Sequence, residues 1–268
     1  MYELTYLKPK SLSEAAGYLA SHPEAKLISG GMTLIPTLKQ RLARPSHLVD
    51  IGHLSELKGI TLQGDRLSIG AATAHVEVSR SEVVRKALPA LAELAGEIGD
   101  PQVRNRGTLG GSLANNDPAA DYPSAALALG AEIVTDRKTH KADDFFQGVF
   151  ATSLEEGEIV TRVVFPLPRR AAYAKFPHPA SGYAMTGVFV ADFGSSIRVA
   201  VTGAGPGVFR WTAAEEALTR SFGAAALSPL SVDAEGLNAD LHAPAAYRAN
   251  LVKVMAIRAV ETLQGARR

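Results

Sequence analysis

Two glycine pairs, each beside hydroxyl residues, are the positions of this sequence best suited to hold a ligand. The first lies in Ser29-Gly30-Gly31-Met32-Thr33 and the second in Thr108-Leu109-Gly110-Gly111-Ser112. Because glycine has no Cβ, successive backbone N–H groups in such segments can point into one concavity and bind an anion. Two of these nests facing each other would hold a pyrophosphate without a lysine, so the pattern predicts a dinucleotide cofactor.

Other interpretations of the glycine-rich segments are less specific. Each pair taken alone is more often an ordinary tight turn than a binding site. Neither is followed by the Lys and Ser/Thr of a P-loop, which argues against phosphoryl transfer. Residues 203–208 (GAGPGV) half-match a Rossmann fingerprint, but they run into strand-like sequence and are predicted to be a turn between strands.

A polar cluster, residues 115–121 (NNDPAAD), follows the second pair. It is typical of a helix N-terminus with an Asx turn, and it also suits binding of sugar or ribityl hydroxyls by Asp121 and nearby amides. Tyr183 is equally compatible with a half-buried strand and with a site. The seven histidines form no metal-binding pair, so no metal site is predicted.

The composition limits the class of protein. The chain has 268 residues, of which 46% are hydrophobic and 21% charged, enough for a large core. The 28 basic and 27 acidic residues argue against nucleic acid as the main partner. No apolar run is as long as a membrane span and the first residues do not resemble a signal peptide, so we expect a cytoplasmic protein.

The absence of cysteine restricts redox chemistry in particular. Disulfides, cysteine-ligated clusters and a cysteine nucleophile are excluded within this sequence. Any redox function therefore requires an organic cofactor or a partner.

The periodicity predicts alternating helices and strands. Residues 26–29, 34–42 and 47–51 read as strand, helix and strand, which predicts a small parallel unit. Further strands are expected at 59–62, 66–70, 132–134, 157–165, 173–176, 185–192 and 196–202, and further helices at 15–19, 83–94, 123–129, from 212 and at 246–263. The Pro- and Arg-rich segment 166–170 is the best boundary between two parts.

The chain resembles the FAD-binding medium subunits of molybdenum hydroxylases, of the aerobic carbon monoxide dehydrogenase type, with the xanthine dehydrogenase flavin domain as a relative. The resemblance covers nearly the whole sequence, and it is carried by the segments 27–36, 48–51, 102–111, 117–121 and 246–248. It implies an α+β fold: a two-lobed FAD-binding domain of the PCMH (vanillyl-alcohol oxidase-like) type over residues 1–170, with lobes of about 1–57 and 58–170. A smaller α+β domain with an antiparallel sheet, of the carbon monoxide dehydrogenase flavoprotein type, would occupy 171–268.

The resemblance also implies a set of FAD contacts. Backbone of the two glycine segments would hold the pyrophosphate, Thr33 and Thr108 would add hydroxyls, and Asp121 would hold a ribityl or ribose hydroxyl. Ile98 and Val160 would form an apolar wall, with Thr161 competing for the second position. Lys175 would be a charged contact, and Tyr183 would stack on the isoalloxazine. The complete implied set is Ile28, Ser29, Gly30, Gly31, Met32, Thr33, Leu34, Ile35, Ile98, Thr108, Gly110, Gly111, Ser112, Asp121, Val160, Lys175 and Tyr183.

Two positions depart from the family pattern. Met32 stands where His or Gln is common, and Gly182 stands where an acidic residue is common. They favour the alternative of a scaffold that keeps the fold and has lost FAD. A second alternative is a self-contained FAD oxidoreductase, although no base for a substrate pocket is evident.

The implied function is electron transfer. The subunit would assemble with a large molybdenum-cofactor subunit and a small subunit carrying two [2Fe–2S] clusters, as a dimer of heterotrimers. It would pass electrons from the clusters through FAD to an external acceptor. No side chain of this chain would be catalytic, because the cofactor supplies the chemistry.

Overall fold

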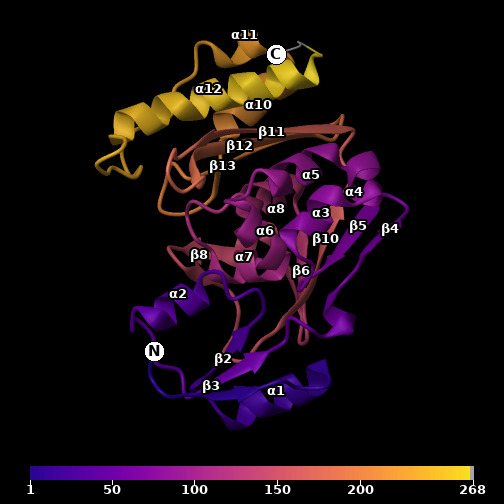
Figure 1. Ribbon diagram of the computed structural model, residues 1–268. Coiled ribbons are helices and arrows are strands. Elements are labelled where there is room, and N and C mark those ends of the chain that lie inside the picture. The colour runs from indigo at the N-terminus through magenta and orange to yellow at the C-terminus, as the bar shows by residue number, and fades with distance from the viewer. Residues whose placement is uncertain (266–268) are drawn as a thin grey trace.

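The computed structural model describes residues 1–265 and contains three main sheets (Figure 1). The N-terminal part is a parallel sheet of order β1-β3-β2, as the sequence predicts. Ser11 caps the first helix by accepting a hydrogen bond from Glu14 N–H. The elements are β1 (Thr5–Leu7), α1 (Leu12–Ser21), β2 (Ala25–Ile28), α2 (Leu34–Lys39) and β3 (His47–Asp50).

The middle part is a five-stranded antiparallel sheet of order β4-β5-β10-β6-β7, packed against a group of short helices. Its strands are β4 (Ile60–Gln63), β5 (Arg66–Gly70), β6 (Glu132–Thr135), β7 (Thr139–Lys141) and β10 (Val160–Pro166), with β8 (Phe146–Gly148) and β9 (Ala151–Thr152) as a separate hairpin. Its helices are η1 (Ser55–Leu57), α3 (His75–Arg80), α4 (Glu82–Ala87), α5 (Pro89–Gly96), α6 (Pro101–Arg106), α7 (Leu109–Asn115), α8 (Tyr122–Leu129) and α9 (Ala142–Phe145).

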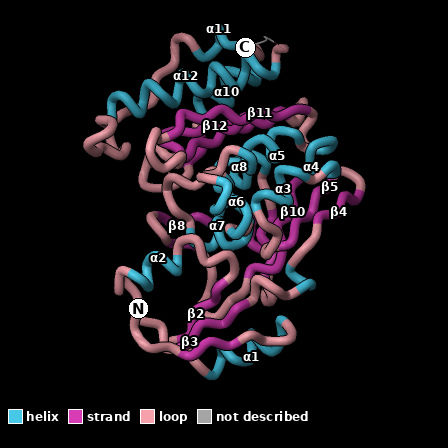
Figure 2. Tube along the Cα trace, in the orientation of Figure 1, coloured by secondary structure: helices cyan, strands magenta, loops and turns pink. Residues whose placement is uncertain are grey.

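The C-terminal part is a four-stranded antiparallel sheet of order β11-β12-β13-β14. Every residue of β12 is buried, because α5 and α8 contact one face of the sheet while α10 and α12 contact the other. Its elements are β11 (Arg170–Pro177), β12 (Ala184–Asp192), β13 (Ile197–Thr202), β14 (Phe209–Arg210), α10 (Thr212–Arg220), α11 (Ala224–Leu227) and α12 (Ala245–Leu263). Figure 2 shows the helices of the middle part lying between this sheet and the N-terminal unit.

The predicted α+β class is confirmed, and three local predictions need correction. The helix expected at 83–94 is two helices, because Pro89 begins α5 and holds Leu88 at φ −147°, ψ 68°, outside the helical region. The strand expected at 157–165 begins at Val160, after Gly157 has turned the chain with φ +72°. The second glycine pair lies inside α7 and not in a turn.

One other expectation is met. The glycine-rich segment at 203–208 connects β13 to β14, as expected of a turn between strands. Within residues 1–265, no helix combines the length and apolarity needed to cross a membrane.

Candidate cofactor cleft

A cleft of about 790 Å³ opens between the N-terminal parallel unit and the helices of the middle part. Both glycine segments line it, although they are almost eighty residues apart in the sequence. Of the seventeen residues implied by the resemblance, Ile35 and Lys175 lie outside the lining and the others border it. Val160 borders the cleft, whereas the hydroxyl of its competitor Thr161 donates to Val134 O within the sheet. The fold therefore brings most of the predicted set into one space.

The first glycine segment presents a run of unpaired backbone donors to the cleft. It connects the carboxyl end of β2 to α2, and Gly31 has φ +72°. Within the described chain, the backbone N–H groups of Gly30, Gly31, Met32 and Thr33 donate no hydrogen bond. Such a run of unpaired donors is uncommon in proteins and needs an acceptor from water or a ligand.

The second glycine segment differs from the prediction. Thr108 caps α7, and the N–H groups of Leu109, Gly110 and Gly111 donate to Thr73 O, Ala71 O and Thr108 Oγ1, respectively. The expected second nest is therefore wrong, since its donors already have partners in the chain. A Cβ on Gly110 would lie 2.5 Å from that of Ala71, so this glycine is needed for close packing.

The two glycine segments touch each other in the cleft. Thr108 Oγ1 donates to Ser29 Oγ at 3.2 Å. A Cβ added to Gly30 would overlap the carbonyl oxygen of Arg106 and crowd Gly107. The close approach needs glycine at position 30 because any larger residue would separate the segments.

Asp121 belongs to a buried polar cluster at the cleft. Its carboxylate accepts a hydrogen bond from Tyr173 Oη at 2.5 Å and pairs with Lys175 Nζ at 2.9 Å. Both charged side chains are 3% exposed. Burial raises the pKa of Asp121, while Lys175 and Tyr173 oppose that shift. Asp121 borders the cleft, whereas Lys175 contacts it from outside the cleft lining. The carboxylate of Asp121 keeps spare lone pairs for a ligand hydroxyl.

Tyr183 stands at the cleft with 42% of its surface exposed. Its loop, between β11 and β12, is closed by hydrogen bonds from His178 N–H to Tyr183 O and from Gly182 N–H to His178 O. Gly182 has φ +70°, a backbone conformation that favours glycine over residues with a side chain. The ring is therefore available to a flat ligand.

Among the lining residues that sequence reasoning did not predict, two stand out, His75 and Phe150. His75 begins α3 and is buried in the cleft floor. Phe150 is 58% exposed at φ +53°, on a hairpin tip that the buried Asn116 holds through hydrogen bonds to Gly148 O and Ala151 O. Neither had a sequence signal, because a lone histidine or phenylalanine carries no spacing pattern.

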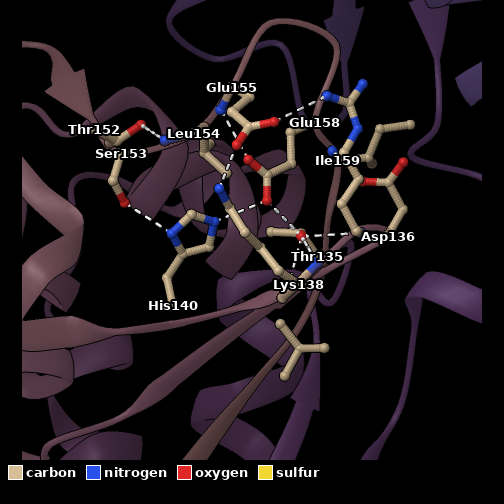
Figure 3. A network of polar contacts seen from close by, with 12 residues as sticks. Thr135, Asp136, Lys138, His140, Thr152, Ser153, Leu154, Glu155, Glu158 and Ile159 are labelled. Atoms are coloured by element: carbon tan, nitrogen blue, oxygen red, sulfur yellow. Dashed lines mark hydrogen bonds and ion pairs between the residues drawn. The ribbon is translucent and has the colours of Figure 1, made fainter.

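A polar network braces the cleft wall at residues 153–159 (Figure 3). Glu158, which borders the cleft, accepts hydrogen bonds from Thr135 Oγ1 at 2.6 Å, Glu155 N–H at 2.8 Å and His140 Nε2 at 2.8 Å. A carboxylate only accepts, so Nε2 is the protonated nitrogen and Nδ1 of a neutral ring accepts from Ser153 Oγ at 2.9 Å. The network ties the β6–β7 hairpin to the segment that precedes β10.

Glu158→Gln is expected to destabilise the fold by about 1–3 kcal/mol, because an amide N–H₂ would face donors that a carboxylate now satisfies. Burial alone would raise the pKa of Glu158, but the hydrogen bonds from Thr135 and Glu155 N–H outweigh it and hold the pKa below its usual value. The stability that Glu158 contributes to the fold is therefore fully present above the unfolded Glu pKa of about 4.3. It is lost as pH falls through the lower pKa that Glu158 has in the folded state.

Urea unfolding at several pH values measures this difference, with the exposed Glu156→Gln as the matched control. A wild-type advantage that does not shrink on acidification would contradict the role given to Glu158.

Comparison with known proteins places this geometry in context. The family described as the FAD binding domain in molybdopterin dehydrogenase matches residues 2–168. The carbon monoxide dehydrogenase medium chain of Hydrogenophaga pseudoflava is 38% identical over 218 residues, 76% of each chain. The nicotine 6-hydroxylase medium subunit of Paenarthrobacter nicotinovorans is 35% identical over 271 residues, 96% of each chain.

Two solved structures are similar to this chain over almost its entire length. Carbon monoxide dehydrogenase from Hydrogenophaga pseudoflava, in a form that lacks the Mo-pyranopterin moiety of its cofactor, gives a TM-score of 0.87 at 34% identity, covering 99% of this chain and 98% of the other. Quinoline 2-oxidoreductase from Pseudomonas putida 86 also gives 0.87, at 31% identity and the same coverage. These similarities confirm the predicted fold class.

Proposed function

We propose a function from the premise that this chain belongs to the family of FAD-binding domains of molybdopterin dehydrogenases. It is an FAD-binding oxidoreductase subunit, like its relatives among the carbon monoxide and xanthine dehydrogenases. We infer that it takes electrons from [2Fe–2S] clusters of a partner subunit and passes them to an external acceptor. FAD, when bound, supplies the redox chemistry, and this chain binds and orients it.

The run of four unpaired N–H groups from Gly30 to Thr33 in the cleft is the observation that carries the proposal. These donors suit the oxygens of a pyrophosphate. The space beside Gly30 is too narrow for any side chain, because a Cβ added there would overlap Arg106 O. Thr33 would add a hydroxyl, whereas Thr108 and Gly110 shape the floor through packing and capping. Met32 borders the nest without weakening it, because the donors belong to the backbone.

The other end of the cleft suits the flavin rings and the ribityl chain. Ile98 and Val160 offer apolar surface, and Tyr183 offers an exposed ring for stacking. Asp121, held by Lys175 and Tyr173, would accept a hydrogen bond from a hydroxyl of the cofactor.

We propose two partner subunits for this chain. The chain has no cysteine and so no thiolate to ligate a cluster, which is consistent with clusters carried by a partner. The similarity to medium subunits supports a small [2Fe–2S] subunit and a large molybdenum-cofactor subunit as these partners. We propose a dimer of such heterotrimers in the cytoplasm. Within this chain, we propose an FAD-binding domain at 1–170 with lobes of about 1–57 and 58–170, and a C-terminal domain at 171–268.

The visible absorption spectrum tests the proposal, recorded on the purified chain titrated with FAD and on the chain co-expressed with large and small subunits. We expect flavin bands near about 450 nm that stay with the protein until it is denatured. Iron and molybdenum that purify with the complex would support the electron-transfer role. A complex without flavin would overturn it and favour the scaffold.

A further inference from the structure

His75 occupies a special place in the floor of the cleft. Its side chain is 4% exposed, and its backbone N–H donates to Gly107 O at 3.0 Å. A Cβ on Gly107 would lie 2.6 Å from His75 Nε2, so the ring is packed directly beneath this glycine. Gly107 is also close to Gly30, because a Cβ added to Gly30 would lie 2.8 Å from Gly107 Cα. The imidazole therefore lies where the two glycine segments meet.

The ring of His75 has polar atoms without partners. In residues 1–265, neither ring nitrogen has a hydrogen-bond partner, and Nδ1 is fully shielded from solvent. The neighbouring ring of Tyr122, at a centroid distance of 5.3 Å, has a shielded hydroxyl that also lacks a partner. A buried polar group left unsatisfied costs about 1–3 kcal/mol, and such groups in native proteins call for an explanation such as a ligand or water.

The surroundings of His75 keep it neutral. Burial lowers the pKa of His75 to about 4, and the positive charge of Arg104 adds to the effect. Arg104 is itself held by hydrogen bonds to Ile98 O and Gly99 O. A neutral imidazole has one N–H donor and one acceptor nitrogen. With the proton on Nε2, the N–H donor of His75 lies beside Gly107 at the cleft. The nitrogen that stays shielded from solvent is then Nδ1, which acts only as an acceptor.

On the basis of the proposed function, we propose that His75 is a further cofactor-binding residue, whose Nε2–H donates a hydrogen bond to an acceptor atom of the flavin nucleotide. Such a hydrogen bond would orient the acceptor atom of the nucleotide without placing a charge in the cleft. Tyr122 does not border the cleft and packs behind the ring. The Nε2–H donor, which has no partner among residues 1–265, would thus gain one when the cofactor enters.

The experiment measures the dissociation constant of FAD for the full chain and its variants by quenching of flavin fluorescence, with thermal unfolding recorded in parallel. His75→Leu is expected to weaken FAD binding about tenfold, which corresponds to ~1.4 kcal/mol. His75→Gln keeps an N–H donor and is expected to recover most of the affinity. Tyr122→Phe, the matched control, removes a hydroxyl outside the cleft and is expected to bind FAD like the wild type.

The outcomes separate the two hypotheses. Equal losses in His75→Leu and His75→Gln would mean that the ring acts by packing, and this would overturn the inference. So would a His75→Leu affinity within about twofold of the wild type, which is less than one net hydrogen bond. If the wild type binds no FAD, either alone or in the assembled complex, the proposed function fails, and the inference fails with it.

Discussion

Gly30→Ala is expected to weaken FAD binding by about 100-fold, or ~2.7 kcal/mol. The new Cβ would overlap Arg106 O and crowd Gly107, both of which are backbone and cannot rotate away. The segments must separate, which breaks the contact between Thr108 and Ser29 and displaces the nest. Overpacking of this kind also costs about 1–3 kcal/mol of folding stability. FAD titration and urea unfolding measure the two effects.

Gly17→Ala is the matched control for this change. Gly17 lies in α1, and nothing comes within 4 Å of an added Cβ. Alanine there should raise the free energy of unfolding by about 0.5–1 kcal/mol through helix propensity and leave FAD binding unchanged. A Gly30→Ala variant that binds FAD as tightly as Gly17→Ala would show that the contact between the segments is dispensable.

The contrast between the two glycine pairs shows how far sequence reasoning reaches. The nest from Gly30 to Thr33 could be predicted, because a short strand, a glycine pair and a helix former follow one another in local sequence. The second pair has the same local composition, yet Thr108 caps a helix there that begins at Leu109. The partners that satisfy Leu109 and Gly110 are Thr73 and Ala71, which only the folded chain brings near. Local sequence could not distinguish an open nest from a satisfied one.

The fold shows the same limit. Alternation and capping patterns located most strands and helices. The break in the helix at Pro89 was missed, although proline's missing N–H could have indicated it. The pairing order could not be predicted, because β10 lies between β5 and β6 and its residues pair with β5 residues 92 to 100 positions earlier in the chain. The pairing of Asp121 with Lys175 likewise cannot be predicted from spacing, since it depends on how the fold brings β11 to the start of α8. The family resemblance implied both residues as cofactor contacts, and the structure shows that they form an ion pair with each other.

Lys175→Met is expected to destabilise the fold by about 3–5 kcal/mol, because it leaves the carboxylate of Asp121 buried without its cation. Tyr173 alone cannot replace that charge. The variant should also bind FAD more weakly, since Asp121 borders the cleft. Lys141→Met, at an exposed lysine of β7, controls for the loss of one positive charge and should change stability by no more than about 0.5 kcal/mol.

The pH dependence and a double-mutant cycle distinguish charge from packing at this site. Burial raises the pKa of Asp121 above its unfolded value, and loss of Lys175 would raise it further. A carboxyl whose folded pKa is raised loses stability as pH rises between the unfolded and folded values. The cost of Lys175→Met should therefore be smaller at about pH 5 than at about pH 8. Asp121→Asn combined with Lys175→Met should cost less than the sum of the single changes, because the uncompensated charge is gone. Strict additivity and a cost independent of pH would instead assign Lys175 a packing role alone, and its contribution to the cleft would then come from its aliphatic stem.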